Sequence, residues 1–172
     1  MTTEALAETP THPADALLQL LDRHALPYDI VEHEPVFTIA DALAATPEIG
    51  GIKTKNVFLR DAKGTRHFLA VVPHDLRLDL PALARMLGSS KLSMGSPERL
   101  QRCLGITPGA VSVFALVNDK AHAVELLMDE RVWQAAQVQA HPLRNTATVA
   151  IGHDALASFL ALTGHAPRVL AL

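Results

Sequence analysis

The sequence contains little cysteine, few aromatic residues and little net charge. Cys103 is the only cysteine, so no disulfide can form within the chain. Aromatic residues make up 4% of the sequence, so the core must consist mainly of Leu, Ala, Val and Ile. The formal net charge is −3, whereas proteins that coat duplex nucleic acid usually carry a broad basic surface. We therefore expect no DNA binding, and only local contact with any nucleic acid.

Long hydrophobic runs are also missing. No apolar run approaches the ~20 residues that span a bilayer, and residues 1–10 lack the regions of a signal peptide. We therefore expect a cytoplasmic protein without membrane contact. The chain has 172 residues, of which 49% are hydrophobic, and this is enough for one sizeable core. We predict a disordered tail over residues 1–11 and a single domain over residues 12–172.

Several common catalytic and metal-binding motifs are absent. None of the nine histidines stands in a His-x-x-x-His or His-Glu-x-x-His pattern, so we expect no metal. We expect surface or capping roles for the eight histidines other than His141. No Gly-x-Ser-x-Gly elbow, Walker loop or Gly-x-Gly-x-x-Gly motif occurs, so neither a serine nucleophile nor a nucleotide cofactor is indicated. Cys103 lies in an apolar helical stretch, which indicates a buried or half-buried residue.

Helical periodicity and capping residues predict the helices. Thr11 is placed to cap the first helix, and a capping box of Thr38 and Asp41 opens the second. Asp154 is expected to cap the last helix, whose core-facing residues include Leu162. Further helices are predicted over residues 79–87, 96–104 and 130–136.

Apolar and β-branched runs predict strands. They cover residues 28–32, 57–59, 68–72, 91–93, 111–117, 123–128, 146–151 and 169–170. The runs 57–59 and 68–72 are continuously apolar and joined by a turn, which predicts a hairpin buried on both faces. We expect a second hairpin from strands 111–117 and 123–128. The prediction is an α/β (α+β) fold with a mixed, largely antiparallel, curled sheet of about six or seven strands surrounded by helices.

Three stretches place hydrogen-bonding groups beside apolar runs, and the first is Lys53-Thr54-Lys55-Asn56-Val57-Phe58-Leu59. Lys55 stands at the mouth of a buried strand, where a cation can hold a phosphate or carbonyl oxygen. Asn56 places an amide on the opposite side of the strand. Taken alone, a lysine whose stem lies along the surface at a strand end is the more common explanation.

The other two stretches are Gly105-Ile106-Thr107-Pro108-Gly109-Ala110-Val111 and His141-Pro142-Leu143-Arg144-Asn145. The loop around Gly105, Pro108 and Gly109 can expose successive backbone N–H groups to a ligand oxygen, although Pro108 donates none. Taken alone, it fits an ordinary helix C-cap and turn. His141 and Asn145 can present donors or acceptors to a cleft, although His141 by itself is more often structural.

In combination, these stretches resemble a known family. The patterns Lys-Thr-Lys-Asn-aliphatic-Phe-Leu-Arg-Asp, Gly-x-x-Pro-Gly-x-Val and His-Pro-Leu-x-Asn are similar to those of the YbaK/prolyl-tRNA editing family. The resemblance covers nearly the whole chain. It implies the YbaK/aminoacyl-tRNA synthetase-associated domain fold and a free-standing aminoacyl-tRNA deacylase. Gln139-Ala140 departs from the pattern, because a hydrophobic or aromatic residue is expected there.

The resemblance also implies roles for the residues of the site. Lys55 would bind and orient the 3′-terminal nucleotide or its aminoacyl ester, supported by Asn56, while Lys53 would be a bystander. The backbone of residues 105–109 would hold the substrate carbonyl or amine. His141 would line the same pocket, with Asn145 as a further substrate-binding residue. The family uses no metal, cofactor or covalent intermediate. Lysine is a poor general base at neutral pH, which favours an electrostatic role for Lys55.

The branch with the most similar motifs hydrolyses alanyl-tRNA of the proline type. The resemblance therefore implies a trans-editing hydrolase that acts on the acceptor end of mischarged tRNA, most of all Ala-tRNA(Pro). Removal of cysteine or another small amino acid is an alternative, and so is a non-catalytic RNA-end binding module of the same fold. Prolyl-tRNA synthetase and an elongation factor are the candidate protein partners. The sequence indicates no oligomeric state.

Overall fold

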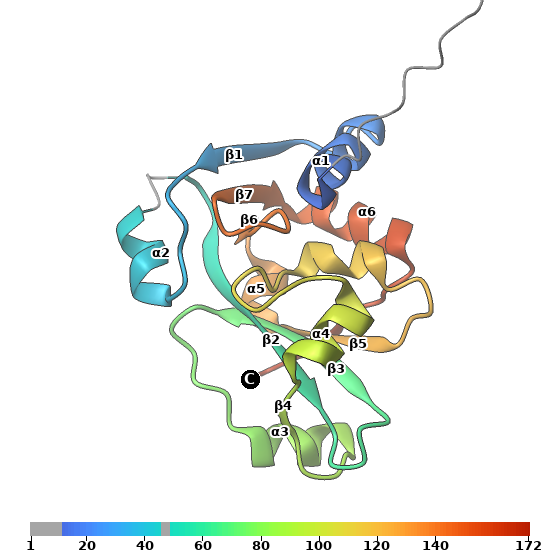
Figure 1. Cartoon of the computed structure of the whole chain (residues 1–172). Coiled ribbons are helices and arrows are strands. Elements are labelled where there is room, and N and C mark those ends of the chain that lie inside the picture. Colours follow the sequence, from blue (N-terminus) through green and yellow to red (C-terminus); the bar gives the residue numbers. More distant parts are fainter. Residues whose placement is uncertain (1–11, 46–48) are drawn as a thin grey trace, which may run out of the picture.

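The computed structural model describes residues 12–45 and 49–172 (Figure 1). Its strands form one sheet in the order β1-β7-β6-β2-β3-β5-β8, with β4 paired to β2. The strands are β1 (Tyr28–Glu32), β2 (Ile52–Arg60), β3 (His67–Pro73), β4 (Ser93–Met94), β5 (Val124–Asp129), β6 (Gln137–Ala140), β7 (Ala147–Gly152) and β8 (Arg168–Leu170). The helices are α1 (Pro13–Arg23), α2 (Ile39–Ala45), α3 (Leu80–Leu87), α4 (Pro97–Leu104), the 3-10 helix η1 (Val113–Asn118), α5 (Glu130–Gln134) and α6 (His153–Thr163). The predicted mixed α/β fold is confirmed, with eight strands in the described ranges.

The sheet combines both strand orientations. The antiparallel pairs are β1–β7, β6–β7, β2–β3 and β2–β4. The parallel pairs are β2–β6, β3–β5 and β5–β8. Antiparallel pairing therefore prevails only narrowly over parallel pairing.

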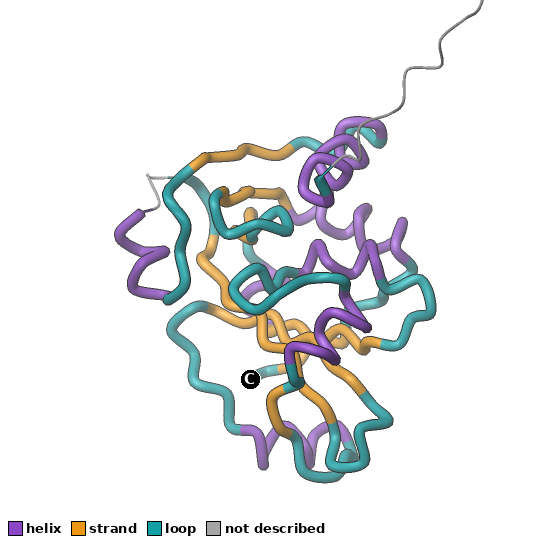
Figure 2. The backbone as a smooth tube through the Cα atoms, viewed as in Figure 1, coloured by secondary structure: helices purple, strands orange, loops and turns teal. Residues whose placement is uncertain are grey.

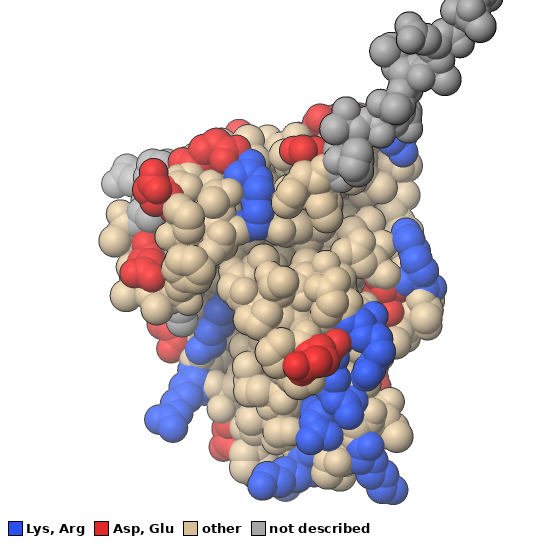
Figure 3. Space-filling view, viewed as in Figure 1, with Lys and Arg blue, Asp and Glu red and all other residues tan. Residues whose placement is uncertain are grey.

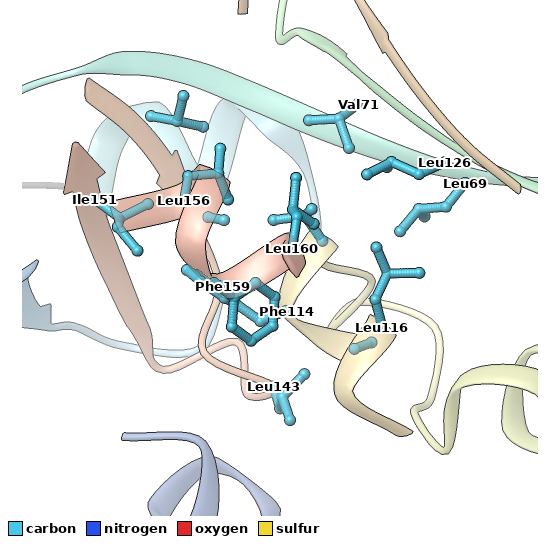
Figure 4. Close-up of a cluster of buried hydrophobic side chains, with 14 of the residues drawn as sticks. Leu69, Val71, Phe114, Leu116, Leu126, Leu143, Ile151, Leu156, Phe159 and Leu160 are labelled. Atoms are coloured by element: carbon cyan, nitrogen blue, oxygen red, sulfur yellow. The ribbon is translucent and has the colours of Figure 1, made fainter. Parts of the chain in front are cut away.

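The β2–β3 hairpin forms the centre of the sheet, as its apolar runs predict. Leu69 and Val71 face the larger hydrophobic cluster, which contains residues of α1, α4, η1 and α6 (Figure 4). Phe68 and Ala70 face a second cluster with Leu83 and its neighbours on α3. All of β3 is buried, because helices cover the hairpin on both faces.

The predicted capping residues account for several helix ends. The Thr38 hydroxyl accepts a hydrogen bond from the Asp41 N–H at 3.0 Å, and the Asp41 carboxylate accepts the Thr38 N–H at 3.2 Å. Ser96 caps α4 by accepting the Arg99 N–H, and Gly105 ends this helix with φ +64°. These local rules fix where the chain enters α2 and where it enters and leaves α4.

The predicted strand over residues 111–117 is wrong. Residues 113–118 form η1, in which Ser112 accepts the Phe114 N–H, and Phe114 packs edge-on against Phe159 at 5.3 Å (Figure 4). A short run of apolar residues suits a buried helical turn as well as a buried strand. The predicted second hairpin is consequently absent, and β5 pairs in parallel with β3 instead.

Other differences concern helix ends and short strands. Gly152 is the N-cap of α6, so Asp154 lies within its first turn, and Leu162 is 47% exposed instead of facing the core. The strand predicted over residues 91–93 is observed at Ser93–Met94, and β6 was not predicted. His67 and His165 are buried, so a surface role is wrong for both.

The N-terminal predictions can be tested only in part. The predicted tail over residues 1–11, including Thr11, lies outside the described residues. The N-cap of α1 is His12, whose Nδ1 accepts the Ala14 N–H at 3.1 Å. In the described ranges, no helix is both long enough and apolar enough to cross a membrane.

Candidate functional site

A cleft of about 240 Å³ opens beside the N-terminal half of β2. Its lining residues come from α2 and the segment that leads into it, from β2, from His74 after β3, from the loop after α4, and from the β6–β7 hairpin. Figure 2 shows the backbone path of these segments. The lining residues of β2 are Lys53, Thr54, Lys55 and Asn56. The cleft therefore brings together parts of all three sequence stretches that resemble the editing family.

The cleft lies where β2 and β6 separate. Their parallel pairing includes only Ile52 with Val138 and Lys53 with Gln139. The Thr54 hydroxyl then donates to the Gln139 carbonyl at 2.6 Å. Beyond this point β2 remains paired with β3, which gives the cleft a rigid wall.

Lys55 lies in this wall. It pairs through its backbone with Val72 of the buried strand β3, and its side chain is half-buried in the cleft. Among the described residues, no carboxylate forms an ion pair with Lys55. The ammonium group is therefore suited to bind an anionic or carbonyl oxygen of a ligand.

Asn56 contributes an unsatisfied hydrogen-bond acceptor. Its Oδ1 is buried and has no hydrogen-bond partner in the described part of the chain. Leaving a buried polar atom unpaired costs about 1–3 kcal/mol, so such an atom beside a cleft is suited to receive a donor from a ligand.

A backbone contact defines which nitrogen of the His141 ring carries the hydrogen. Its Nδ1 lies 2.9 Å from the Ala147 carbonyl, so Nδ1 carries a hydrogen and Nε2 of the neutral ring is an acceptor. Burial lowers the pKa of His141; the bond to Ala147 partly opposes this, and nearby His33 lowers it further. The ring is thus held neutral near pH 7.

Two residues that were not predicted as site residues support this wall. The His33 ring lies 6.1 Å from that of His141, and its nitrogens bond the Glu34 carbonyl at 2.8 Å and the Thr148 hydroxyl at 2.9 Å. The Gln139 amide donates to the carbonyls of Ile49 at 2.8 Å and Gly50 at 3.2 Å. The polar residue that departs from the family pattern therefore fixes the turn before β2.

A family model for the aminoacyl-tRNA editing domain matches residues 33–159, which include every residue that lines the cleft. The chain belongs to the aminoacyl-tRNA editing family. The predicted membership and the predicted aminoacyl-tRNA deacylase activity are thereby confirmed.

Individual relatives agree with this assignment. The prolyl-tRNA editing protein ProX of Acetoanaerobium sticklandii is 37% identical over 157 residues, covering 91% of this chain and 96% of the relative. Prolyl-tRNA synthetase associated domain-containing protein 1 of Danio rerio is 32% identical over 166 residues, with coverages of 95% and 90%. The crystal structure of a candidate trans-editing enzyme for prolyl-tRNA synthetase has a TM-score of 0.63 at 22% identity, covering 94% of this chain and 98% of that one. That structural likeness concerns the fold.

The predicted site residues of the editing domain form two groups, those that line the cleft and those that do not. Lys55, Asn56, Gly109 and His141 line the cleft, and Gly109 has φ +93°, a backbone conformation that favours glycine. The remaining three, Gly105, Pro108 and Asn145, are not among the lining residues. Substrate binding by these three remains a prediction.

Two residues of the second group have visible structural roles. Gly105 is the C-cap of α4, and a Cβ added there would lie 3.2 Å from Nδ2 of Asn118. The Asn145 amide donates to the Val36 carbonyl at 3.0 Å, and the Asn145 carbonyl accepts the Val36 N–H at 3.1 Å. Asn145 thus holds the segment that covers one side of the cleft.

This segment of the editing domain carries two apolar side chains at the rim of the cleft. Phe37 is 76% exposed and Leu43 is 45% exposed, and both line the opening. Large apolar side chains are usually buried, so their exposure beside a cleft is consistent with contact to a ligand. Phe37 was also missed by sequence reasoning, because its exposure depends on the path of the chain before α2.

Proposed function

We propose that the protein acts in trans to hydrolyse alanyl-tRNA(Pro). The observation that carries this proposal is that Lys55 lines the same cleft as Asn56, whose Oδ1 has no hydrogen-bond partner among the described residues. An alanyl ester offers a carbonyl and a nearby phosphate for the cation, and an α-ammonium donor for Oδ1. The names of ProX and of the zebrafish relative support a proline tRNA and an association with prolyl-tRNA synthetase.

In this mechanism the protein positions an ester that is already activated. Lys55 holds the carbonyl or the terminal phosphate, while the Oδ1 of Asn56 accepts a hydrogen bond from the α-ammonium group. Water adds to the carbonyl carbon, and the bond to the ribose oxygen then breaks. The products are alanine and a tRNA whose ribose oxygen has taken up a proton. Positioning and charge stabilisation supply the acceleration, with the ribose hydroxyl assisting the water.

The lining of the cleft suits a small amino acid. Apart from the rim, its apolar residues are Val36, Ala42, Val111 and Ala140. A synthetase site sized for proline rejects alanine poorly, because missing methylene groups are worth only about 1–3 kcal/mol. A second site that admits alanine and excludes proline by steric clash corrects this error. The proposed reaction takes place in the cytoplasm, where prolyl-tRNA synthetase or an elongation factor could deliver the substrate.

The test is a panel of proline tRNAs charged with alanine, cysteine, serine or proline. We expect rapid hydrolysis of the alanyl ester and little hydrolysis of the prolyl ester. Faster hydrolysis of the cysteinyl ester would instead support the alternative substrate. Hydrolysis of none, with retained binding of the tRNA end, would support a non-catalytic module.

Lys55→Ala tests the proposed role of the cation. We expect a loss of deacylation of at least about 100-fold with little change in melting temperature, because a charge-assisted contact to the reacting ester is removed. Lys53→Ala is the matched control, since it removes the same charge from the same strand. Equal losses in both variants would contradict a specific role for Lys55.

A further inference from the structure

A second surface of the protein carries a concentration of positive charge, although the net charge is −3. Figure 3 shows Lys and Arg side chains gathered over α4 and the end of the β2–β3 hairpin. We define the basic surface by its members, Arg60, Lys63, Lys91, Arg99, Arg102 and Lys120. Lys63, Lys91, Arg102 and Lys120 are exposed.

Contacts between their elements hold these residues on one surface. Arg60 pairs with Ser93 between β2 and β4, and the Ser90 hydroxyl accepts the N–H of Ala62 in the hairpin turn. The Arg99 guanidinium donates to the Gly64 carbonyl at 3.2 Å, which ties α4 to the same turn. The cluster is therefore a fixed feature of the fold.

The basic surface is not neutralised by acidic side chains. None of its six members forms an ion pair with another described residue, whereas Arg66, Arg131 and Arg144 are each paired with a carboxylate. Glu98 in the first turn of α4 is exposed, but it forms no ion pair with any of the six members. Two other carboxylates near this surface are engaged elsewhere. Asp61 accepts N–H groups of its own turn, and Asp119 accepts those of Ala123 and Val124.

The buried His67 lies close to the cations of the basic surface, which affect its pKa. Burial lowers the pKa of His67, and the charges of Arg99 and Arg102 lower it further. Its Nε2 lies 3.0 Å from the Arg99 guanidinium, which can only donate, so this nitrogen is an acceptor. Unpaired cations gathered on one surface create a positive potential that attracts an anionic partner.

A hollow lies within this surface. It is lined by the hairpin turn at Thr65, by α4 at Arg102, by the end of η1 at Asn118, and by Lys120 in the loop that follows. The charged donors of Arg102 on α4 and of Lys120 in the loop after η1 therefore converge on one concave region, whereas the N–H and hydroxyl groups of Thr65 donate to Asp61. Such a region is complementary to a projecting phosphate group.

The basic surface and the cleft are connected by one face of β2. The face of β2 that α4 covers carries the side chains of Asn56, Phe58 and Arg60, because every second residue of a strand faces the same side. Asn56 in the cleft and Arg60 are four residues apart, which is about 13 Å along the strand. At ~3.4 Å per stacked nucleotide, about four unpaired nucleotides cover that distance. If the unpaired nucleotides of an RNA 3′ end in the cleft follow β2, the first base pairs of the duplex therefore reach the basic surface.

We propose that the basic surface binds the phosphate backbone of the acceptor-stem duplex of the tRNA whose aminoacylated end occupies the cleft. This inference rests on the proposed function, because it uses the same tRNA. The surface supplies affinity and orientation, whereas the cleft supplies the chemistry. Binding of this kind depends on salt and not on base sequence.

The double variant Arg102→Gln/Lys120→Gln tests the proposal. We expect the Kd for uncharged tRNA, measured by fluorescence anisotropy, to rise roughly tenfold at low salt, and the slope of log Kd against log salt to fall by roughly 2. For alanyl-tRNA(Pro), kcat/KM should fall by a similar factor. Hydrolysis of an alanyl ester of the isolated CCA trinucleotide should be unchanged.

Two further variants make the test specific. Arg23→Gln/Arg85→Gln removes the same charge from exposed sites on α1 and α3, and should leave the Kd unchanged. Lys63→Gln/Lys91→Gln changes other members of the basic surface and should repeat the loss. An unchanged Kd and salt slope in both basic-surface variants would overturn the proposal and favour an acidic protein as the partner. Because uncharged tRNA is the probe, absent deacylation would contradict only the proposed function.

Discussion

Asn56→Leu should make the protein more stable and less active. The substitution keeps a side chain of similar size but removes Oδ1, which is buried without a partner in the described residues. Asn145→Leu is the matched control, because its amide donates to the Val36 carbonyl at 3.0 Å. The same chemical change is thus made at an unsatisfied and at a satisfied amide.

The expected magnitudes follow from this difference. Removing an unpaired buried acceptor relieves about 1–3 kcal/mol, and the amide group as a whole retains some solvation, so we expect the free energy of unfolding to rise by about 1–2 kcal/mol. For a chain of this size that corresponds to a melting temperature about 2–8 °C higher. Asn145→Leu should lower the free energy of unfolding by about 1 kcal/mol. A hydrogen bond from a charged donor is worth about 1.5–3 kcal/mol, so kcat/KM of Asn56→Leu should fall about 10- to 100-fold.

Urea denaturation and single-turnover deacylation of alanyl-tRNA(Pro) measure the two effects. A higher urea midpoint at an unchanged m-value, together with slower deacylation, would support a ligand-binding role for Oδ1. A lower midpoint with unchanged deacylation would refute the reasoning, because Asn56 would then serve only the fold.

Three further predictions concern other parts of the cleft. Folding lowers the pKa of His141, so the stability that the neutral ring contributes is present above about pH 6.5 and is lost as the pH falls through the lowered pKa. His141→Gln should therefore make the urea midpoint less dependent on pH between pH 7.5 and 5. Gly109→Ala should slow deacylation and lower the free energy of unfolding by about 1 kcal/mol, because φ is +93° and an L-residue is strained in this conformation. An added Cβ meets no atom within 4 Å, so the strain does not come from a clash. Gly88→Ala is the control: φ is +60° with equally open space, so this variant should lose similar stability without slower deacylation. Phe37→Ala should leave the melting temperature within about 1 °C, because this side chain is exposed. It should weaken binding of the CCA end about 5- to 100-fold, since a base stacked on the Phe37 ring is worth about 1–3 kcal/mol. Unchanged binding would contradict stacking on Phe37.

Predictions based on local rules agree best with the structure. The continuously apolar hairpin and the Thr38 capping box require only neighbouring residues, and both are observed. The apolar run after Ser112 was assigned to a strand because periodicity cannot distinguish a short buried strand from a helical turn. The parallel pairing of β3 with β5 joins residues far apart in the chain, and no local pattern indicates it.

The same distinction applies to the candidate site. Motif resemblance selected Lys55, Asn56 and His141, and the structure places all three on one cleft. It also selected Asn145, which holds the segment around Val36 and whose binding of substrate remains a prediction. A sequence motif groups residues that a family retains, whether they contact the ligand or position the chain. Only the fold separates these two roles.

The fork between β2 and β6 explains how consecutive residues can share one ligand. In a strand, Lys55 and Asn56 point to opposite faces of the sheet, and their neighbours confirm this: Val57 packs with the α3 cluster, whereas Phe58 packs with the larger cluster. In a continuous sheet the two side chains would lie on separate surfaces. Here pairing with β6 ends at Lys53, so a ligand at the open edge of β2 can contact both faces. The proposed chemistry therefore depends on the end of a strand pairing as much as on the identity of the two residues.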